Sequence, residues 1–311
     1  MNFEESIKRL RAEKNAVILA HYYQTGDIQD IADFVGDSLA LSQEAASTDA
    51  DIILFAGVKF MAETAKILSP EKMVLLPDLE AGCSLADSCK ADDFEKFLAE
   101  NPGRTVVTYV NTTAEIKALS DIICTSSNAI QIVESLPADE KIIFAPDRNL
   151  GNFVLNKTGR DIVVWNGACH VHEEFSLEAI LELKKENAGA KVIVHPECEL
   201  PIRMIADFIG STSALLEYSK TDSSDKYVVA TEVGIIHQMQ KANPGKVFIP
   251  APPKDSTCGC SECNFMKLIT LEKIYNCLDT ESPEITLNKD IIRKAQKPIN
   301  RMLEISKRFG L

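Results

Sequence analysis

Cysteine is the residue type in this sequence with the clearest chemical meaning. There are nine cysteines in 311 residues, and five of them are candidates for metal binding in three short polar segments. The segments are LEAGCSLADSC with Cys83, WNGACHVHEEF with Cys169, and PKDSTCGCSEC with Cys258, Cys260 and Cys263. Where thiols stay reduced, so many cysteines indicate metal binding or redox chemistry more readily than disulfides. For the other four we expect small buried apolar side chains: Cys89, Cys124, Cys198 and Cys277.

One thiolate from each segment, brought to a common point, would suit an iron–sulfur cluster. A [4Fe–4S] cluster is fully ligated by four cysteines, so three leave one iron open as a Lewis acid for a substrate. A structural zinc site is usually closed by four ligands. His170 and His172 lie next to Cys169 in sequence and keep zinc as an alternative. We predict one [4Fe–4S] cluster per chain.

A threefold internal repeat would position these segments. The repeated stretches are VILAHYYQTGDIQDIADFVGDSLAL, VVTYVNTTAEIKALSDIICTSSNAI and VIVHPECELPIRMIADFIGSTSAL. Each begins with an apolar run that ends at a polar residue, with offsets of 88 and 86 residues between copies: His21, Tyr109 and His195. An aspartate follows 12 positions later in every copy: Asp33, Asp121 and Asp207. This agreement without gaps indicates three copies of one unit.

Each copy continues with the same order of elements. A second apolar run follows (DIILFAG, KIIFAPD, KYVVATE), then a helical stretch, then a third run (KMVLLPD, DIVVWNG, KVFIPAP). Strands separated by helices predict parallel sheets covered on both faces. We therefore predict an α/β fold of three homologous βαβαβ layer-sandwich units around a pseudo-threefold axis. The predicted boundaries are 1–101 with an N-terminal helix, 102–188, 189–263, and a helical C-terminal cover at 264–311.

The cysteine segments follow the third apolar run of each copy. Cys83 lies 62 residues after His21, and Cys169 lies 60 residues after Tyr109. The cysteines of the third copy lie 63 to 68 residues after His195, so the spacing favours Cys258. Loops at the carboxyl ends of parallel strands are where ligands bind, and we expect the three loops to meet there.

Polar residues at equivalent places of the repeat are the candidates for substrate binding. A hydroxyl residue opens the second helical stretch of every copy: Ser38, Ser126 and Thr212. Such hydroxyls beside free N–H groups cap a helix and also form an anion site, and we expect both roles. The residues at the ends of the first strands, His21, Tyr109 and His195, should point into the cavity.

The residues two positions beyond the first strands extend this set: Tyr23, Asn111 and Glu197. Glu197 is the best candidate for a general base, because a carboxylate in a closed, partly apolar site is expected to have a raised pKa.

Composition limits the other classes of function. Lysine and arginine number 33 against 46 acidic residues, a formal charge of −13. Duplex binding normally requires a basic face, so we expect no nucleic-acid partner. The charged N-terminus has no apolar signal core, and no apolar run is long enough to span a bilayer. We expect a cytoplasmic protein without a membrane role.

The motifs taken together resemble those of the quinolinate synthase family over essentially the whole chain. The matching segments, in order, are AHYYQ, DIADFVGDSL, YVNTTAEIKALSDIICTSSNA, FAPDRNLG, the Cys169 loop, VHPEC, FIGSTSAL and TEVGIIHQM. The family pattern favours Cys263 as the third metal ligand, because the sequence Asn-Phe-Met-Lys follows it. The simplest members carry one cysteine in this loop, whereas here there are three. We therefore take Cys83, Cys169 and Cys263 as the metal ligands. It stays open whether Cys258 or Cys260 replaces Cys263 as a ligand or forms a redox disulfide.

The resemblance implies a transferase of de novo NAD synthesis. It would condense iminoaspartate, made by an upstream aspartate oxidase or dehydrogenase, with dihydroxyacetone phosphate, releasing quinolinate, phosphate and water. The open iron would polarise substrate oxygen or nitrogen. The implied proton-transfer residues are Glu197, His195, Tyr23 and His21. The implied substrate-binding residues are Tyr109, Asn111, Ser38, Ser126 and Thr212, together with His21, His195 and Glu197. The alternatives are an iron–sulfur hydro-lyase acting on a hydroxy acid and a zinc-stapled α/β binding module.

Overall fold

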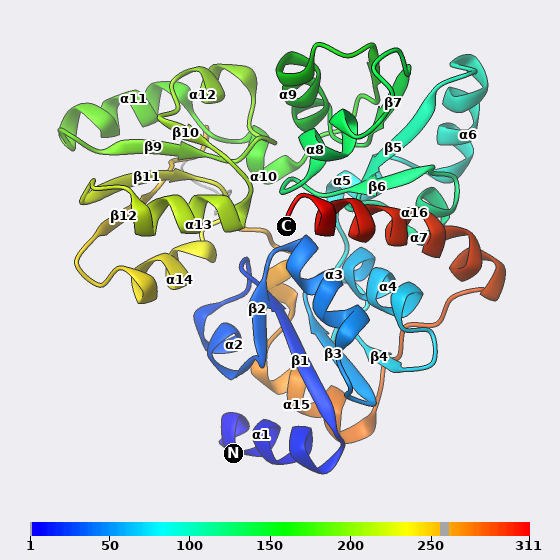
Figure 1. The fold of residues 1–311 in the computed structure, drawn as a ribbon. Helices are drawn as coiled ribbons and strands as arrows, with labels where there is room; N and C mark the ends of the chain where they lie inside the picture. Colours follow the sequence, from blue (N-terminus) through cyan, green and yellow to red (C-terminus); the bar gives the residue numbers. More distant parts are fainter. Residues whose placement is uncertain (1, 256–260) are drawn as a thin grey trace.

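Three parallel sheets of four strands each make up the computed structural model, which describes residues 2–255 and 261–311. Figure 1 shows them as three lobes around a common centre, coloured blue, cyan to green, and green to yellow. Within the described residues every strand pairing of the three sheets is parallel, with the orders β2-β1-β3-β4, β6-β5-β7-β8 and β10-β9-β11-β12. This arrangement confirms the predicted α/β class and the threefold repeat.

The first unit follows helix α1 (Phe3–Glu13). Its elements are β1 (Ala16–His21), α2 (Gly26–Ile31), β2 (Phe34–Gly36), α3 (Ser38–Ser47), β3 (Ile52–Ala56), α4 (Lys59–Leu68), β4 (Met73–Leu75) and α5 (Ser84–Asp87). The second unit contains α6 (Ala91–Glu100), β5 (Thr105–Tyr109), α7 (Ala114–Ala118), β6 (Ile122–Cys124), α8 (Ala129–Glu134), β7 (Ile142–Ala145), α9 (Arg148–Thr158), β8 (Ile162–Val164) and α10 (His170–Glu173).

The third unit repeats the same order of strands. It contains α11 (Leu177–Glu186), β9 (Lys191–Val194), α12 (Leu200–Met204), β10 (Phe208–Ile209), α13 (Thr212–Thr221), β11 (Lys226–Ala230), α14 (Ile235–Ala242) and β12 (Val247–Pro250). The chain ends with a 3₁₀ turn (Met266–Leu268), α15 (Leu271–Thr280) and α16 (Lys289–Arg308). Among the described helices, none is long and apolar enough to cross a membrane.

Each sheet has one strand more than the sequence predicted. The extra strands β2, β6 and β10 are two or three residues long and follow the repeated aspartates. Those aspartates explain why the short strands form. The side chains of Asp33, Asp121 and Asp207 accept hydrogen bonds of 2.8–2.9 Å from backbone N–H groups of the first strand in their own unit. The repeated aspartate therefore fastens the short edge strand to the sheet.

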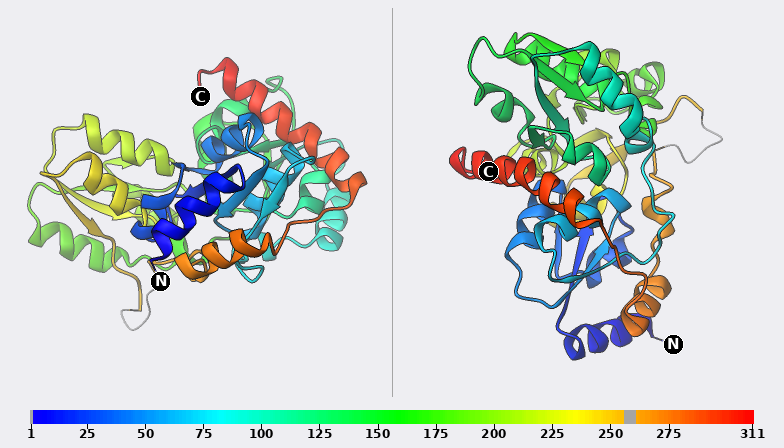
Figure 2. Two further views of the ribbon diagram at one scale, coloured as in Figure 1. Left: turned by 90° about the horizontal axis from the view of Figure 1, so that it is seen from below. Right: turned by 90° about the vertical axis from the view of Figure 1, so that its right-hand side faces the viewer.

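The C-terminal helices cover the first two units. Helix α15 packs beside α1 on the first unit, and Figure 2 shows these two helices next to each other. Helix α16, red in Figure 1, lies in the seam between the first and second units and contacts α4, α7, α8 and β6. Helix α16 of the C-terminal segment thus contacts both the first and the second unit along the seam between them.

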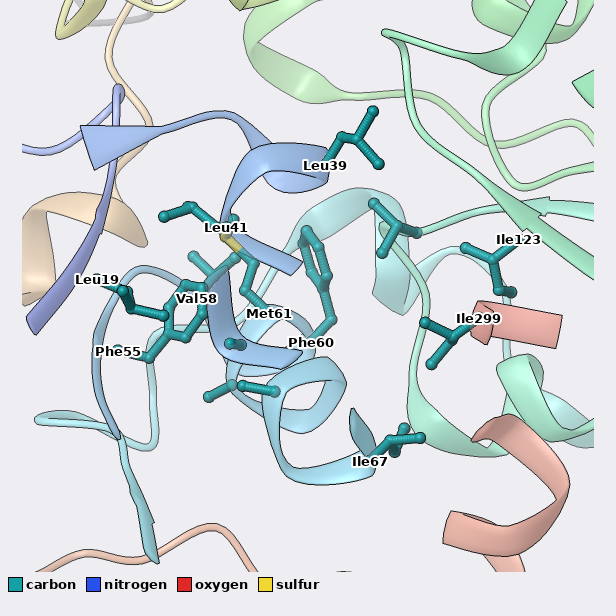
Figure 3. Close-up of a cluster of buried hydrophobic side chains, with 14 of the residues drawn as sticks. Leu19, Leu39, Leu41, Phe55, Val58, Phe60, Met61, Ile67, Ile123 and Ile299 are labelled. Carbon is teal, nitrogen blue, oxygen red and sulfur yellow. The ribbon is translucent and has the colours of Figure 1, made fainter. Parts of the chain in front are cut away.

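The apolar core is continuous across that seam. Figure 3 shows Phe60 and Ile67 of α4 facing Ile123 of β6 and Ile299 of α16. Ile67, Ile123 and Ile299 are completely buried, and burial of one such side chain stabilises the fold by about 2 kcal/mol. The third unit has separate apolar clusters on the two faces of its sheet. Units one and two therefore share one core across the seam, the second unit has a further cluster on the other face of its sheet, and the third unit has its own core.

Candidate active site and metal centre

One cavity lies where loops from all three units meet. Its lining includes every residue that the sequence analysis selected for the site: His21, Tyr23, Ser38, Cys83, Tyr109, Asn111, Ser126, Cys169, His195, Glu197, Thr212 and Cys263. Residues separated by more than two hundred positions come together because the carboxyl ends of the parallel strands face the cavity, as expected for this class of fold. The same cavity is also lined by Asp37 and Glu232, which the sequence analysis did not select, and by His172, which it considered only as an alternative zinc ligand.

The three cysteines occupy equivalent places in their units. Cys83 immediately precedes α5, Cys169 precedes α10, and Cys263 lies just before the C-terminal 3₁₀ turn. All three line the cavity, and the charge of Cys263 raises the pKa of Cys83, while the charges of Cys83 and Cys263 both raise that of Cys169. Cys258 and Cys260 lie outside the described residues.

Burial dominates the acid–base behaviour of these thiols. It raises the pKa of Cys83 to about 12, and it raises the pKa values of Cys169 and Cys263 as well. A thiolate is the form that binds metal, and in such surroundings it needs a nearby positive charge. Three soft sulfur donors on one buried cavity are the donor set that iron–sulfur clusters use. The residues therefore fit the cluster that the sequence predicts.

The other described cysteines are away from this group. Cys89, Cys124, Cys198 and Cys277 are at most 2% exposed and belong to the apolar clusters. Burial raises the pKa of each, so they remain thiols. Their position agrees with the expected role as small apolar side chains.

The two histidines at the strand ends are neutral at pH 7. Desolvation by burial lowers the pKa of His21 to about 4 and that of His195 to about 3. The Nδ1 atom of His21 accepts a hydrogen bond of 3.1 Å from the backbone N–H of Tyr23. The proton of the neutral ring is consequently on Nε2, which makes His21 a hydrogen-bond donor toward a ligand.

Glu197 differs from the prediction in one respect. Its side chain is 3% exposed, and burial alone would raise its pKa. His172, whose Nδ1 lies 2.9 Å from Glu197 Oε2, opposes burial with its charge and its hydrogen bond. The charge of His195 and a hydrogen bond from Tyr109 act in the same direction, and the pKa is lowered instead. The expected raised pKa was therefore wrong, because it counted burial without the histidine partner. The other oxygen, Oε1, is buried and has no hydrogen-bond partner among the described residues.

His172 connects several of the site residues. Its Nδ1 also lies 3.1 Å from Cys169 Sγ, and its Nε2 lies 3.0 Å from Thr231 Oγ1. Thr231 Oγ1 in turn lies 2.7 Å from the hydroxyl of Tyr23. A chain of hydrogen-bonding groups thus runs from Glu197 through His172 and Thr231 to Tyr23. The sequence signal for His172 was its position three residues after Cys169, which suggested only an alternative zinc ligand.

The repeated hydroxyl residues do not cap their helices. The cap of α3 is Asp37, which accepts the N–H of Ala40, and the cap of α13 is Ser211, which accepts the N–H of Ala214. Ser38 and Thr212 are therefore the first helical residues rather than caps. The capping part of the prediction was wrong for these two. Because the preceding residue satisfies the helix end, both hydroxyls face the cavity rather than the helix, and that of Thr212 lies 3.1 Å from the hydroxyl of Tyr23.

Ser126 departs from its two equivalents. Helix α8 begins three residues later, at Ala129, so Ser126 lies in the preceding turn. It still lines the cavity and forms a hydrogen bond with Tyr109 that lowers the tyrosine's pKa, although burial, the largest effect, raises that pKa overall. Asn111 also faces the cavity, and its buried Oδ1 has no partner in the described part of the chain. A polar ligand would supply partners for these groups.

Comparison with known proteins agrees with the motifs. The family model described as Quinolinate synthetase A protein matches residues 5–304. Quinolinate synthase of Thermosynechococcus vestitus is 62% identical over 301 residues, covering 97% of this chain and 94% of that protein. Quinolinate synthases of Microcystis aeruginosa and Chloroherpeton thalassium are 61% and 57% identical, over 97% of this chain and 94% of each relative. This chain therefore belongs to the quinolinate synthase family.

Proposed function

We propose that this enzyme is a transferase that condenses iminoaspartate with dihydroxyacetone phosphate, giving quinolinate, phosphate and water for NAD synthesis. The observation that carries the proposal is the single cavity lined by one cysteine from each unit together with all the polar residues of the family motifs. An upstream aspartate oxidase or dehydrogenase would supply the imine. We place the reaction in the cytoplasm, where a cysteine-rich site stays reduced.

The proposed metal ligands are Cys83, Cys169 and Cys263, which would hold one [4Fe–4S] cluster per chain. With three cysteines as its protein ligands, such a cluster would supply Lewis-acid chemistry to a substrate oxygen. The Cys–His–Glu group at Cys169, His172 and Glu197, whose donor atoms lie within 4.8 Å of one another, also has the chemistry of a metal site. Because His172 and Glu197 already pair with each other at 2.9 Å, we assign them to proton transfer instead.

Glu197 is the proposed general base. Its lowered pKa keeps it ionised at pH 7, and its unpaired Oε1 is free to take a proton from a substrate carbon or nitrogen. The hydrogen-bond chain through His172 and Thr231 then allows proton exchange with Tyr23, whose pKa burial raises well above 10. Neutral His21 and His195 would donate hydrogen bonds to developing negative charge or to a leaving hydroxyl group.

The anionic groups of the substrates require several donors. Ser38 and Thr212 stand at the N-termini of α3 and α13, where free backbone N–H groups add to their hydroxyls. Ser126, Tyr109 and Asn111 line the part of the same cavity that comes from the second unit. We propose that these residues hold the carboxylates and the phosphate, since hydroxyl and amide groups bind anions without a fixed positive charge.

The test is a direct assay without oxygen. The purified protein is given L-aspartate with an aspartate dehydrogenase and NAD⁺, which accepts the two electrons and so forms the imine without oxygen. Dihydroxyacetone phosphate is added, and quinolinate is measured by chromatography. We expect quinolinate and inorganic phosphate in equal amounts, and none when the triose phosphate is omitted. Dehydration of hydroxy acids, the alternative chemistry, is not expected. An iron-loaded protein that forms no quinolinate would overturn the proposal.

A further inference from the structure

Two buried carboxylates occupy the same place in the second and third units. Strands β7 and β11 end at Ala145 and Ala230, which pair with Thr108 and Val194 of the adjacent strands. Two residues beyond each strand end comes a carboxylate, Asp147 in one unit and Glu232 in the other. Both side chains are completely buried. Burying an ionisable group costs free energy of folding unless the group is hydrogen-bonded. Two such groups at the same repeat position therefore indicate a shared structural role.

Asp147 holds the loop that carries Cys169. Its Oδ1 accepts the N–H of Leu150 at 2.6 Å as the cap of α9, while Oδ2 accepts the N–H of Cys169 at 3.3 Å. The loop passes so close to the strand end that a Cβ on Gly167 would lie 2.6 Å from the carbonyl oxygen of Pro146. The Cys169 backbone is therefore fixed to the carboxyl end of β7.

Glu232 holds Cys263 in the same manner. Its Oε1 accepts the N–H of Cys263 at 3.1 Å and lies 2.8 Å from Lys267 Nζ. Its Oε2 accepts the N–H of Gly234 at 2.7 Å. The N–H of Lys267 also donates to the carbonyl oxygen of Cys263 at 3.2 Å, so the cysteine is bound from both sides.

The first unit has no carboxylate at the equivalent position. Strand β3 ends at Ala56, which pairs with Ala20, and the residue two positions on is Val58. An apolar side chain accepts no hydrogen bond, so the Cys83 loop is attached by other contacts. One of these is the hydrogen bond of 2.7 Å between Ser84 Oγ and His170 Nδ1, which links the Cys83 loop to the Cys169 loop.

We propose that Asp147 and Glu232 are equivalent positioning residues, which hold the backbones of Cys169 and Cys263 so that their thiols face the metal centre before metal arrives. The inference rests on the proposed cluster. In both side chains each carboxylate oxygen accepts from a different donor. An amide in the same shape would turn one acceptor into an NH₂ donor facing another donor, and the cysteine loop would have to move.

The experiment compares Asp147→Asn and Glu232→Gln with wild type and with Glu63→Gln, all purified and reconstituted with iron and sulfide without oxygen. Glu63 is a matched control, because it is buried and accepts the backbone N–H of Ala114 at 3.0 Å rather than that of a cysteine. Partners of metal ligands typically change metal affinity by about 10- to 100-fold. We expect iron loss to a chelator to be faster by that factor in the two test variants, with an altered electron paramagnetic resonance spectrum of the reduced cluster. Glu63→Gln should match wild type in both measurements.

The outcomes separate this inference from the proposed function. If wild type binds a cluster and both amide variants release iron at the rate of Glu63→Gln, the positioning role is overturned while the proposed function stands. If wild type itself binds no cluster, both are overturned. Should an amide variant fail to fold, Glu232→Asp replaces it, since it keeps the charge but withdraws the carboxylate from Cys263; wild-type iron retention in that variant would contradict the role.

Discussion

Replacing Cys83, Cys169 or Cys263 by alanine, one at a time, is expected to remove the metal and reduce quinolinate formation at least about 100-fold. A cluster with only two protein ligands is exposed and unstable, and alanine offers no donor atom. The measurement is iron and acid-labile sulfide per chain after purification without oxygen, together with the rate of quinolinate formation.

The controls for this series are the other cysteines. Cys277→Ala removes a buried thiol of α15 that packs in the apolar core, and it should keep its iron. Cys258→Ala and Cys260→Ala should keep it as well, since the family pattern favours Cys263. Full iron content in Cys83→Ala, or loss of iron in Cys258→Ala with retention in Cys263→Ala, would contradict the assigned ligands.

Replacing Glu197 by glutamine is expected to lower kcat by about 100- to 10,000-fold while the iron content stays at the wild-type level. Glutamine has nearly the same shape and still accepts the hydrogen bond from His172, but it does not accept a proton. The oxygen that would receive the substrate proton is Oε1 of Glu197, which has no hydrogen-bond partner in the described part of the chain. Initial rates of quinolinate formation, with iron counted on the same sample, measure the effect.

A nearby carboxylate provides the control for Glu197. Glu199 is two residues further on, at the surface, and pairs with Lys254 at 2.9 Å. Glu199→Gln removes the same charge from the same segment without touching the cavity, so its rate should stay within twofold of wild type, about 0.4 kcal/mol. A Glu197→Gln enzyme that keeps more than a tenth of the wild-type rate would exclude the general-base role.

The repeat made the fold predictable from the sequence. Positions that recur in every copy, such as Asp33, Asp121 and Asp207, reflect one backbone hydrogen bond that each unit needs. The same logic placed the strand-end residues and the cysteine loops at one cavity, since equivalent positions in parallel units face the same way. The extra edge strands β2, β6 and β10 were missed because two or three residues between helices give no periodic signal.

Properties that depend on contacts between units were not predictable in this way. The pKa of Glu197 is lowered in part by His172, which comes from the second unit whereas Glu197 comes from the third. The spacing within one copy contains no information about that pair. The caps Asp37 and Ser211 were missed for a local reason, since the hydroxyl or carboxylate one position earlier competes for the same role. Likewise, the carboxylates Asp147 and Glu232 were absent from the candidates because their partners are backbone groups of distant loops.

Mössbauer spectroscopy of the wild-type protein, loaded with ⁵⁷Fe and kept from oxygen, tests the central claim that three units share one cluster with an open iron. The predicted result is about four iron per chain in a [4Fe–4S] signal, of which about one quarter changes when quinolinate or a substrate is added. A protein that binds zinc in place of iron, or a cluster in which no iron responds to these ligands, would contradict the account.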